Sequence, residues 1–167
     1  LGRLLARQLD LVVSDAPAPP AFRSSVRDHR LGRSGSSFLA APALAERLAP
    51  DFPASLHGAP LLAPLADGQL GQIARAWFLR EGLAPDVIAE IADSALLKTL
   101  SRDGLGVTVV PTVAEAPART SYGLRLVGRR AELEVEYFAA VVGEVEPEGW
   151  PGRIIAHARA LLVGAVA

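Results

Sequence analysis

Short apolar runs recur along the chain between more polar segments, and they predict strands. Most of these runs are continuous rather than alternating, and several are rich in β-branched residues. Both features are typical of strands that are covered on both faces in a parallel sheet. The predicted strands are Leu9–Val13, Ser37–Ala40, Leu61–Pro64, Val87–Ile91 and Gly106–Val110.

Between the strands, apolar residues recur with the period of a helix. The clearest case has apolar side chains at i, i+3, i+4, i+7 and i+8, namely Leu70, Ile73, Ala74, Trp77 and Phe78. Gly82 is expected to stop this helix, and Pro85 to prevent it from resuming. Other helices are predicted to open at Pro42, to cover Ala95–Arg102 and to cover about 152–164. Strands that alternate with helices predict an open α/β fold.

The segment 132–142 has a different pattern. Glutamates alternate there with apolar or aromatic residues, which is the period-two signature of a strand with one face open to water. The glutamates are Glu132, Glu134 and Glu136, and their neighbours are Leu133, Val135 and Tyr137. The pattern fits either an edge strand, whose charges would hinder pairing with another chain, or a strand that crosses between two lobes.

Composition narrows the class of protein. Half of the residues are hydrophobic, yet no apolar run approaches the roughly 20 residues of a membrane-spanning helix, so no membrane partner is expected. The formal charge of −1 argues against a nucleic-acid-binding surface on this chain. Without cysteine there are no disulfides or thiolate metal sites, and without methionine residue 1 is not expected to be a translation start.

Two glycines beside a predicted strand raise the question of a phosphate-binding loop. Such a loop follows a strand and opens a helix, whereas Gly104 and Gly106 follow a helix and precede the strand. The third glycine of the motif would fall at Val109. Gly104 is therefore predicted to be the left-handed cap of the helix, and Gly106 to start a tightly packed strand. No cofactor is expected.

Catalytic and metal-binding motifs are incomplete. The segment GRSGSS at 32–37 lacks the final glycine of a nucleophile elbow and precedes a strand, so we predict a flexible serine-rich loop whose hydroxyls could line a pocket. His29, His57 and His157 show no ligand spacing. Because no general base, nucleophile or ligand set stands out, we expect neither an enzyme nor a metal site, and binding is favoured over catalysis.

Three loops share one position, after a predicted strand and before or near a helix, where α/β folds place ligand-binding groups. The N–H groups and positive dipole end of a helix would suit a polar or anionic ligand there. The plain alternative at Asp93 and Ser94 is an N-cap. The candidate effector-binding residues are Ser14, Asp15, Gly68, Gln69, Asp93 and Ser94.

The ordered run of segments resembles a known family. LDLVVSDAPAPP, LAERL, FPASLHGAPLL, RAWFLREGLAPDVIAEIADSALLK and GLGVTVVPT are similar to the effector-binding region of LysR-type transcriptional regulators. The resemblance covers nearly all of residues 3–145. Four segments are most similar to the NhaR-like branch, which activates sodium/proton antiporter genes: DLVVSDAPAPP, PALAERL, ARAWF and EIADSALLK.

The resemblance implies two Rossmann-like lobes, similar to periplasmic binding proteins, with an effector between them. The first lobe is expected at 1–40 plus 131–167 and the second at 41–130. The first lobe would be N-terminally truncated, lacking its first strand and much of its first helix. The N-terminal winged helix-turn-helix of the family would also lie outside this chain. One departure concerns Gly68, because relatives often have a hydroxyl nearby.

The resemblance also implies a function, that of the effector-sensing and dimerising domain of a cytoplasmic transcriptional regulator. The implied effector is sodium or lithium, or else a small polar molecule, and DNA would be bound only through the missing N-terminal domain. A homodimer is expected. The competing interpretation is a free-standing two-lobe solute-binding protein, which would need a secretion signal upstream. An enzyme on a related fold is disfavoured, because no acid/base pair or nucleophile is apparent.

Overall fold

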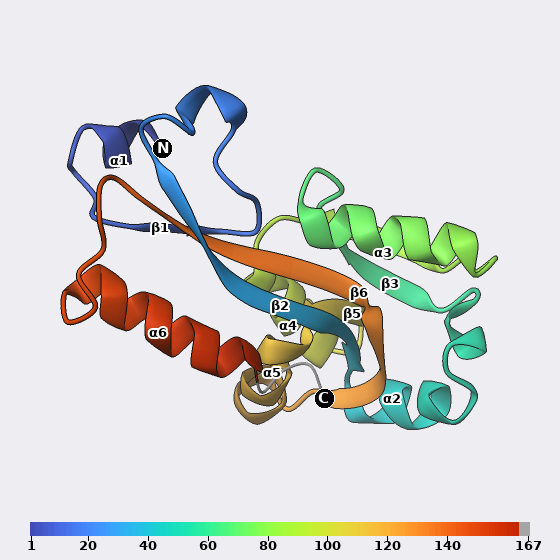
Figure 1. The fold of residues 1–167 in the computed structure, drawn as a ribbon. Coiled ribbons are helices and arrows are strands. Elements are labelled where there is room, and N and C mark those ends of the chain that lie inside the picture. Colours follow the sequence, from blue (N-terminus) through green and yellow to red (C-terminus); the bar gives the residue numbers. More distant parts are fainter. Residues whose placement is uncertain (164–167) are drawn as a thin grey trace. The chain divides into compact units, whose positions relative to one another are not determined.

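The computed structural model describes residues 1–163, and Figure 1 shows helices alternating with strands along the chain. The strands are hydrogen-bonded in the order β1-β6-β2-β5-β3-β4, which confirms the predicted α/β class. The strands are β1 (Val12–Ser14), β2 (Arg27–Ala40), β3 (Pro60–Pro64), β4 (Asp86–Ile91), β5 (Val107–Pro111) and β6 (Arg125–Val141). The α-helices are α1 (Gly2–Leu5), α2 (Pro42–Leu48), α3 (Gln69–Arg80), α4 (Ser94–Arg102), α5 (Glu115–Tyr122) and α6 (Trp150–Val163). Short 3-10 helices cover Pro20–Phe22, Ala49–Asp51, Ala54–Leu56 and Thr112–Ala114.

The chain divides into two compact units. Unit 1 consists of Leu1–Ser34 and Val135–Ala167, and unit 2 of Gly35–Glu134. The long strands β2 and β6 each contribute residues to both units. The expected lobe boundaries, after residues 40 and 130, fall within unit 2 by this division, and the assignment of lobes stays a prediction.

Unit 2 is built on parallel strands. β3 pairs in parallel with both β4 and β5, and helices α3 and α4 connect these strands along the chain. β2 is antiparallel to β5, with Ser37 opposite Val110. Because β3 and β4 are parallel, their carboxyl ends lie at one edge of the sheet, and α3 and α4 begin just beyond that edge.

Trp77 lies in the core of unit 2. Its side chain is only 1% exposed, and its ring centroid is 5.3 Å from that of Phe38. Ala74 and Phe78 are buried in the same cluster, and Leu70 and Ile73 pack against it partly buried. The apolar face predicted for α3 is confirmed, since all five residues contribute to this core.

Left-handed glycines follow the ends of α3 and α4; Gly104 was predicted to be such a cap, and Gly82 was predicted to stop its helix. The backbone φ angle is 67° at Gly82 and 86° at Gly104. The Gly104 N–H donates to the carbonyl of Ser101 (3.0 Å), and the Leu105 N–H donates to the carbonyl of Leu100 (3.2 Å). This pair of hydrogen bonds is a Schellman motif, which satisfies the last carbonyls of the helix and needs a residue that tolerates positive φ.

Gly106 precedes β5 at a point of close backbone approach. A Cβ atom at this position would lie 2.8 Å from the carbonyl oxygen of Pro60, the first residue of β3. Only glycine allows the two strands to come this close without a shift. The prediction of a tightly packed strand start is therefore confirmed, and both glycines have a structural role.

The serine-rich segment 32–37 is a buried strand, so the prediction of a flexible loop is wrong. The segment lies inside β2, which starts at Arg27 rather than at Ser37, and Ser34, Ser36 and Ser37 are fully buried. The small side chains permit close strand packing, because a Cβ at Gly35 would lie 2.9 Å from the Cα of Ala131. Serine is tolerated there because its hydroxyl finds an acceptor. The Ser36 Oγ, for example, donates to a backbone carbonyl at 2.8 Å.

The alternating segment 132–142 belongs to β6, whose alternation is confirmed by the burial of Leu133 and Val135. The strand begins earlier than predicted, at Arg125, and ends at Val141. It is not an edge strand, because β1 and β2 are its neighbours in the sheet. β6 contributes residues to both units, and the alternative, that this strand crosses between the two lobes, stays a prediction.

Unit 1 contains β1, α1 and α6. β1 pairs antiparallel with the end of β6, where Val13 lies opposite Ala139. The sequence predicted β1 over Leu9–Val13, whereas it covers Val12–Ser14. Helix α6 runs close to β2, since a Cβ at Gly32 would lie 2.8 Å from the Cβ of Leu162. Residue 164, the predicted end of this helix, lies outside the described residues.

Candidate functional site

Two of the predicted loops meet at one edge of unit 2. The last residues of β3 and β4, Pro64 and Ile91, are paired in register, and the Leu65 N–H donates to the carbonyl of Ile91 (3.2 Å). Gly68 is the N-cap of α3 and Asp93 the N-cap of α4. The structure therefore places these two helix N-termini at the carboxyl ends of adjacent parallel strands, which is where open α/β sheets bind ligands.

Asp93 caps α4 with its carboxylate. Its Oδ1 accepts hydrogen bonds from the backbone N–H groups of Ala95 (2.7 Å) and Leu96 (2.9 Å). These two bonds hold the pKa of Asp93 below its ordinary value, because they favour the charged form. Ser94 is the first residue of the helix and is exposed. The capping role proposed as the plain alternative is thus shown, and it leaves the carboxylate at the surface.

The N-terminus of α3 has a different character. Gly68 offers only backbone groups, and α3 has no side-chain cap. The preceding loop folds tightly over the first turn, because a Cβ at Gly71 would lie 2.2 Å from the carbonyl oxygen of Leu65. The Gln72 Nε2 donates to the carbonyl of Asp67 (3.3 Å) and closes the loop. Gln69 follows Gly68 as the first helical residue and is half-buried.

Ser14 and Asp15 lie in unit 1, at the end of β1. The Ser14 Oγ donates to the carbonyl of Ala16 and accepts from the Ala16 N–H, so it shapes the turn that follows the strand. Asp15 is exposed. Burial of the Tyr137 hydroxyl, and after it the negative charge of Asp15, raises the pKa of Tyr137 to about 12. The structure brings the helix-start residues of unit 2 together. That Ser14 and Asp15 bind the same effector stays a prediction.

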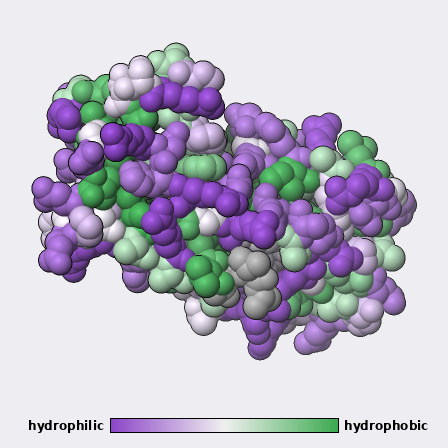
Figure 2. All heavy atoms as spheres, viewed as in Figure 1, coloured by the Kyte–Doolittle hydropathy of each residue, from purple (hydrophilic) through white to green (hydrophobic). Residues whose placement is uncertain are grey.

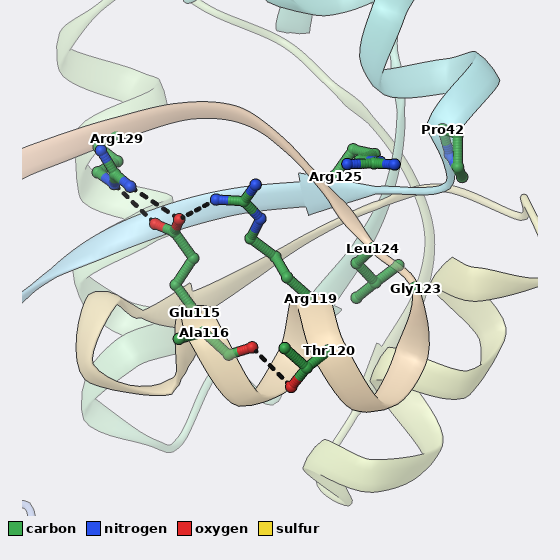
Figure 3. Close-up of a pocket in the computed structure, with 9 residues that line it drawn as sticks. All are labelled: Pro42, Glu115, Ala116, Arg119, Thr120, Gly123, Leu124, Arg125 and Arg129. Carbon is green, nitrogen blue, oxygen red and sulfur yellow. Dashed lines mark hydrogen bonds and ion pairs between the residues drawn. The ribbon is translucent and has the colours of Figure 1, made fainter.

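Sequence reasoning missed a hollow between α5 and the start of β6. It has a volume of about 610 Å³ and lies within unit 2. Figure 3 shows its lining, which consists of Pro42, Glu115, Ala116, Arg119, Thr120, Gly123, Leu124, Arg125 and Arg129. Helix α5 is anchored by Ala118, which packs in a buried cluster with Leu39, Val110 and Leu124.

Glu115 is the buried charge of this hollow. Only 6% of its side chain is exposed, and it makes two hydrogen bonds with Arg129, at 2.7 and 2.8 Å. The Ser37 Oγ donates to the same carboxylate (2.8 Å) and also contacts the hydroxyl of Thr112 (3.0 Å). The arginine foremost, then Ser37, holds the pKa of Glu115 below its ordinary value in spite of burial. The carboxylate in turn raises the pKa of Arg129.

A sequence signal for this cluster existed but was weak. Glu115 and Arg119 stand at i and i+4, the spacing of an ion pair on one helix face, and their contact measures 3.3 Å. Helix α5 itself was not predicted from the sequence, although Pro117 is compatible with it. Pro117 lies in the first turn, where its missing N–H costs no helical hydrogen bond. The partners Ser37 and Arg129 are far away in the sequence.

Two further observations on the described residues concern metal ligands and membrane-spanning helices. Among residues 1–163, histidine and carboxylate side chains nowhere gather in threes as they would around a metal ion. Over the same residues, no helix combines the length and apolar character of a membrane span. Figure 2 shows a face on which hydrophilic residues predominate and apolar residues form small groups.

Comparison with known proteins decides the family. A model described as the LysR substrate binding domain matches residues 1–143. The chain belongs to the LysR substrate binding domain family. This family comprises regulatory domains rather than enzymes, and the family membership and fold predicted from the sequence are confirmed.

Relatives of known sequence and structure are consistent with the family. The transcriptional activator protein NhaR of Escherichia coli is 28% identical over 139 residues, which cover 83% of this chain and 45% of NhaR. The chain thus spans less than half the length of this relative. The regulatory domain of HypT from Salmonella typhimurium superposes with a TM-score of 0.64 at 20% identity, over 98% of this chain and 77% of that domain. A structure of Vibrio fischeri DarR in complex with DNA gives 0.66 at 16% identity, over 96% of this chain and 53% of DarR.

Proposed function

We propose that this LysR-family domain is the effector-sensing and dimerising part of a DNA-binding transcriptional activator that works in the cytoplasm. Its effector would be a small polar molecule or an ion, with sodium and lithium the ions implied by the resemblance to the NhaR-like branch. The observation that supports the proposal most directly is the pair of helix N-termini beside the carboxyl ends of β3 and β4. DNA would be contacted through a domain outside this chain.

An effector acts on such a domain only if it binds two conformations with different affinity. The strands that would transmit a change of conformation between the units are β2 and β6, because each contributes residues to both. Ser14 ends β1 and Asp15 follows it, and β1 is hydrogen-bonded to β6. We therefore propose that these two residues and the helix-start residues Gly68, Gln69, Asp93 and Ser94 respond to one effector.

Thermal unfolding in the presence of candidate effectors tests the proposal. Lithium and sodium chloride are compared with choline chloride at the same concentration, and small organic anions are added as choline salts. The variant Asp93→Asn removes the charge but retains a good N-cap, and Ser94→Ala removes the hydroxyl. We expect an effector to raise the Tm of the wild-type chain and to have little effect on either variant.

Asp103→Asn is the matched control, because Asp103 is an exposed aspartate at the opposite end of the same helix. Its Tm shift should equal that of the wild-type chain. A full effector shift in both Asp93→Asn and Ser94→Ala would rule out the helix-start site. If no member of the panel raises the wild-type Tm, the proposed effector classes are wrong.

A further inference from the structure

The arginines around the hollow of α5 and β6 carry more positive charge than the protein neutralises. Glu115 and Arg129 form a bidentate pair and compensate each other. Arg119 reaches the same carboxylate through a single contact at 3.3 Å, and 41% of its side chain is exposed. The side chain of Arg125 forms no hydrogen bond or ion pair with any residue in the part of the chain that the structure describes. Two guanidinium charges therefore remain at the wall of one hollow.

The local fold holds these two arginines on the same hollow. Glu115 anchors Arg119 from one helical turn away, and Ser37 and Arg129 fix Glu115 in turn. Helix α5 ends at Tyr122 and is capped by Gly123, whose left-handed backbone (φ 67°) lets the chain turn back at once into β6. Arg125, the first residue of β6, thereby lines the same space as Arg119 (Figure 3).

We infer that this hollow binds a small doubly charged oxyanion, a phosphate or sulfate group, through Arg119 and Arg125. A guanidinium presents parallel N–H donors that match the oxygen atoms of such a group, and the bonds are charge-assisted. A dianion would balance the two uncompensated charges and remove their mutual repulsion. The volume of about 610 Å³ exceeds what an inorganic ion needs, so a phosphate carried on a small organic molecule also fits.

The site is distinct from the proposed effector site. None of the helix-start residues of α3 and α4 lines this hollow. The inference therefore rests on the arginines alone and holds or fails independently of the effector at α3 and α4.

Calorimetric titration tests the inference on the whole chain. The probes are sulfate, inorganic phosphate and glycerol 3-phosphate, all as choline salts, against choline chloride at matched ionic strength and against glycerol. Saturable binding is the required signal, because sulfate stabilises proteins generally without a site. We expect Arg119→Gln and Arg125→Gln each to weaken binding about tenfold or more, since each removes charge-assisted hydrogen bonds.

Arg80→Gln is the matched control, because Arg80 is an exposed arginine of unit 2 whose ion pair is with its neighbour Glu81. It should bind like the wild-type chain, and so should Asp93→Asn. Tighter binding of glycerol 3-phosphate than of inorganic phosphate would identify an organic phosphate as the ligand class, and the reverse would identify the free ion. The inference is overturned if none of the three probes binds saturably. It is equally overturned if both arginine variants, shown to be folded by circular dichroism, bind as tightly as the wild-type chain.

Discussion

A single carboxylate organises the α5 region at the scale of residues. Glu115 is nearly inaccessible, and it accepts hydrogen bonds from Ser37, Arg119 and Arg129, which belong to three different elements. A buried charge is stable only when it is paired and hydrogen-bonded, and this one has both kinds of partner. Without Glu115, the two neighbouring arginines would lose the group that positions them.

Replacing Glu115 with glutamine is expected to destabilise the chain by about 1.5–3 kcal/mol at neutral pH, because charged hydrogen bonds are lost. Chemical denaturation measures this loss. The folded-state pKa of Glu115 lies below its reference value of 4.5, so its contribution is present above about pH 4.5 and disappears as the pH falls through the folded-state pKa. The variant should therefore lose less stability than the wild-type chain on acidification.

Glu132→Gln is the control for this prediction. Glu132 is exposed, and its contact with Arg130 is long at 3.7 Å, so the substitution should cost less than about 1 kcal/mol. Equal effects of the two substitutions, or an unchanged acid dependence in Glu115→Gln, would show that the buried pair does not stabilise the fold.

At the scale of elements, glycine positions decide where helices stop and how closely strands pack. Gly104 ends α4 in a left-handed conformation, and a Cβ there would meet no atom within 4 Å. Gly106 is limited by space instead, since its Cβ would press on the backbone of Pro60. The two glycines stand two residues apart and differ in the reason that each one is needed.

The two glycines should respond differently to alanine. Gly104→Ala is expected to cost about 1–2 kcal/mol, the strain of a left-handed L-residue. Gly106→Ala should cost about 2–3 kcal/mol, because β3 and β5 must separate to admit the methyl group. The free energy of unfolding of each variant, measured with urea, gives the order. A larger loss at Gly104 than at Gly106 would contradict the close approach of the two strands.

At the scale of the whole molecule, the chain belongs to a family of regulatory domains and carries a sheet in the order β1-β6-β2-β5-β3-β4. β2 and β6 are long strands that pass through both units. In the order of the sheet, β4 is a terminal strand, and Val87 and Ile88 on it are 49% and 52% exposed. Exposed apolar residues of this kind are compatible with association.

We expect the chain to form a homodimer, as the family resemblance implies. Light scattering over a series of concentrations should give twice the mass of one chain at the upper end, with dissociation on dilution, because association depends on concentration. A mass of one chain throughout the series, up to the highest soluble concentration, would contradict the expected dimer.

Much of this protein could be predicted from local patterns. The helical period around Trp77, the caps at Gly82 and Gly104, the tight start of β5 and the ordered family segments are properties of short stretches, and the structure or the family match bears them out. Local backbone preferences and side-chain periodicity act within a few residues, which is why sequence alone determines them.

Tertiary structure alone decided the rest. The segment 34–37 has a loop-like composition, and only its neighbours in the fold make it a buried strand segment: β6 accepts the Ser36 hydroxyl and closely approaches Gly35, β5 pairs with it, and Glu115 of α5 accepts the Ser37 hydroxyl. Glu115 contacts Arg119 within α5, but its contacts with Ser37 and Arg129 join α5 to β2 and β6, and only the packing of these elements brings them together. Contacts between residues so distant in the sequence depend on how the elements pack, and no local pattern encodes that arrangement.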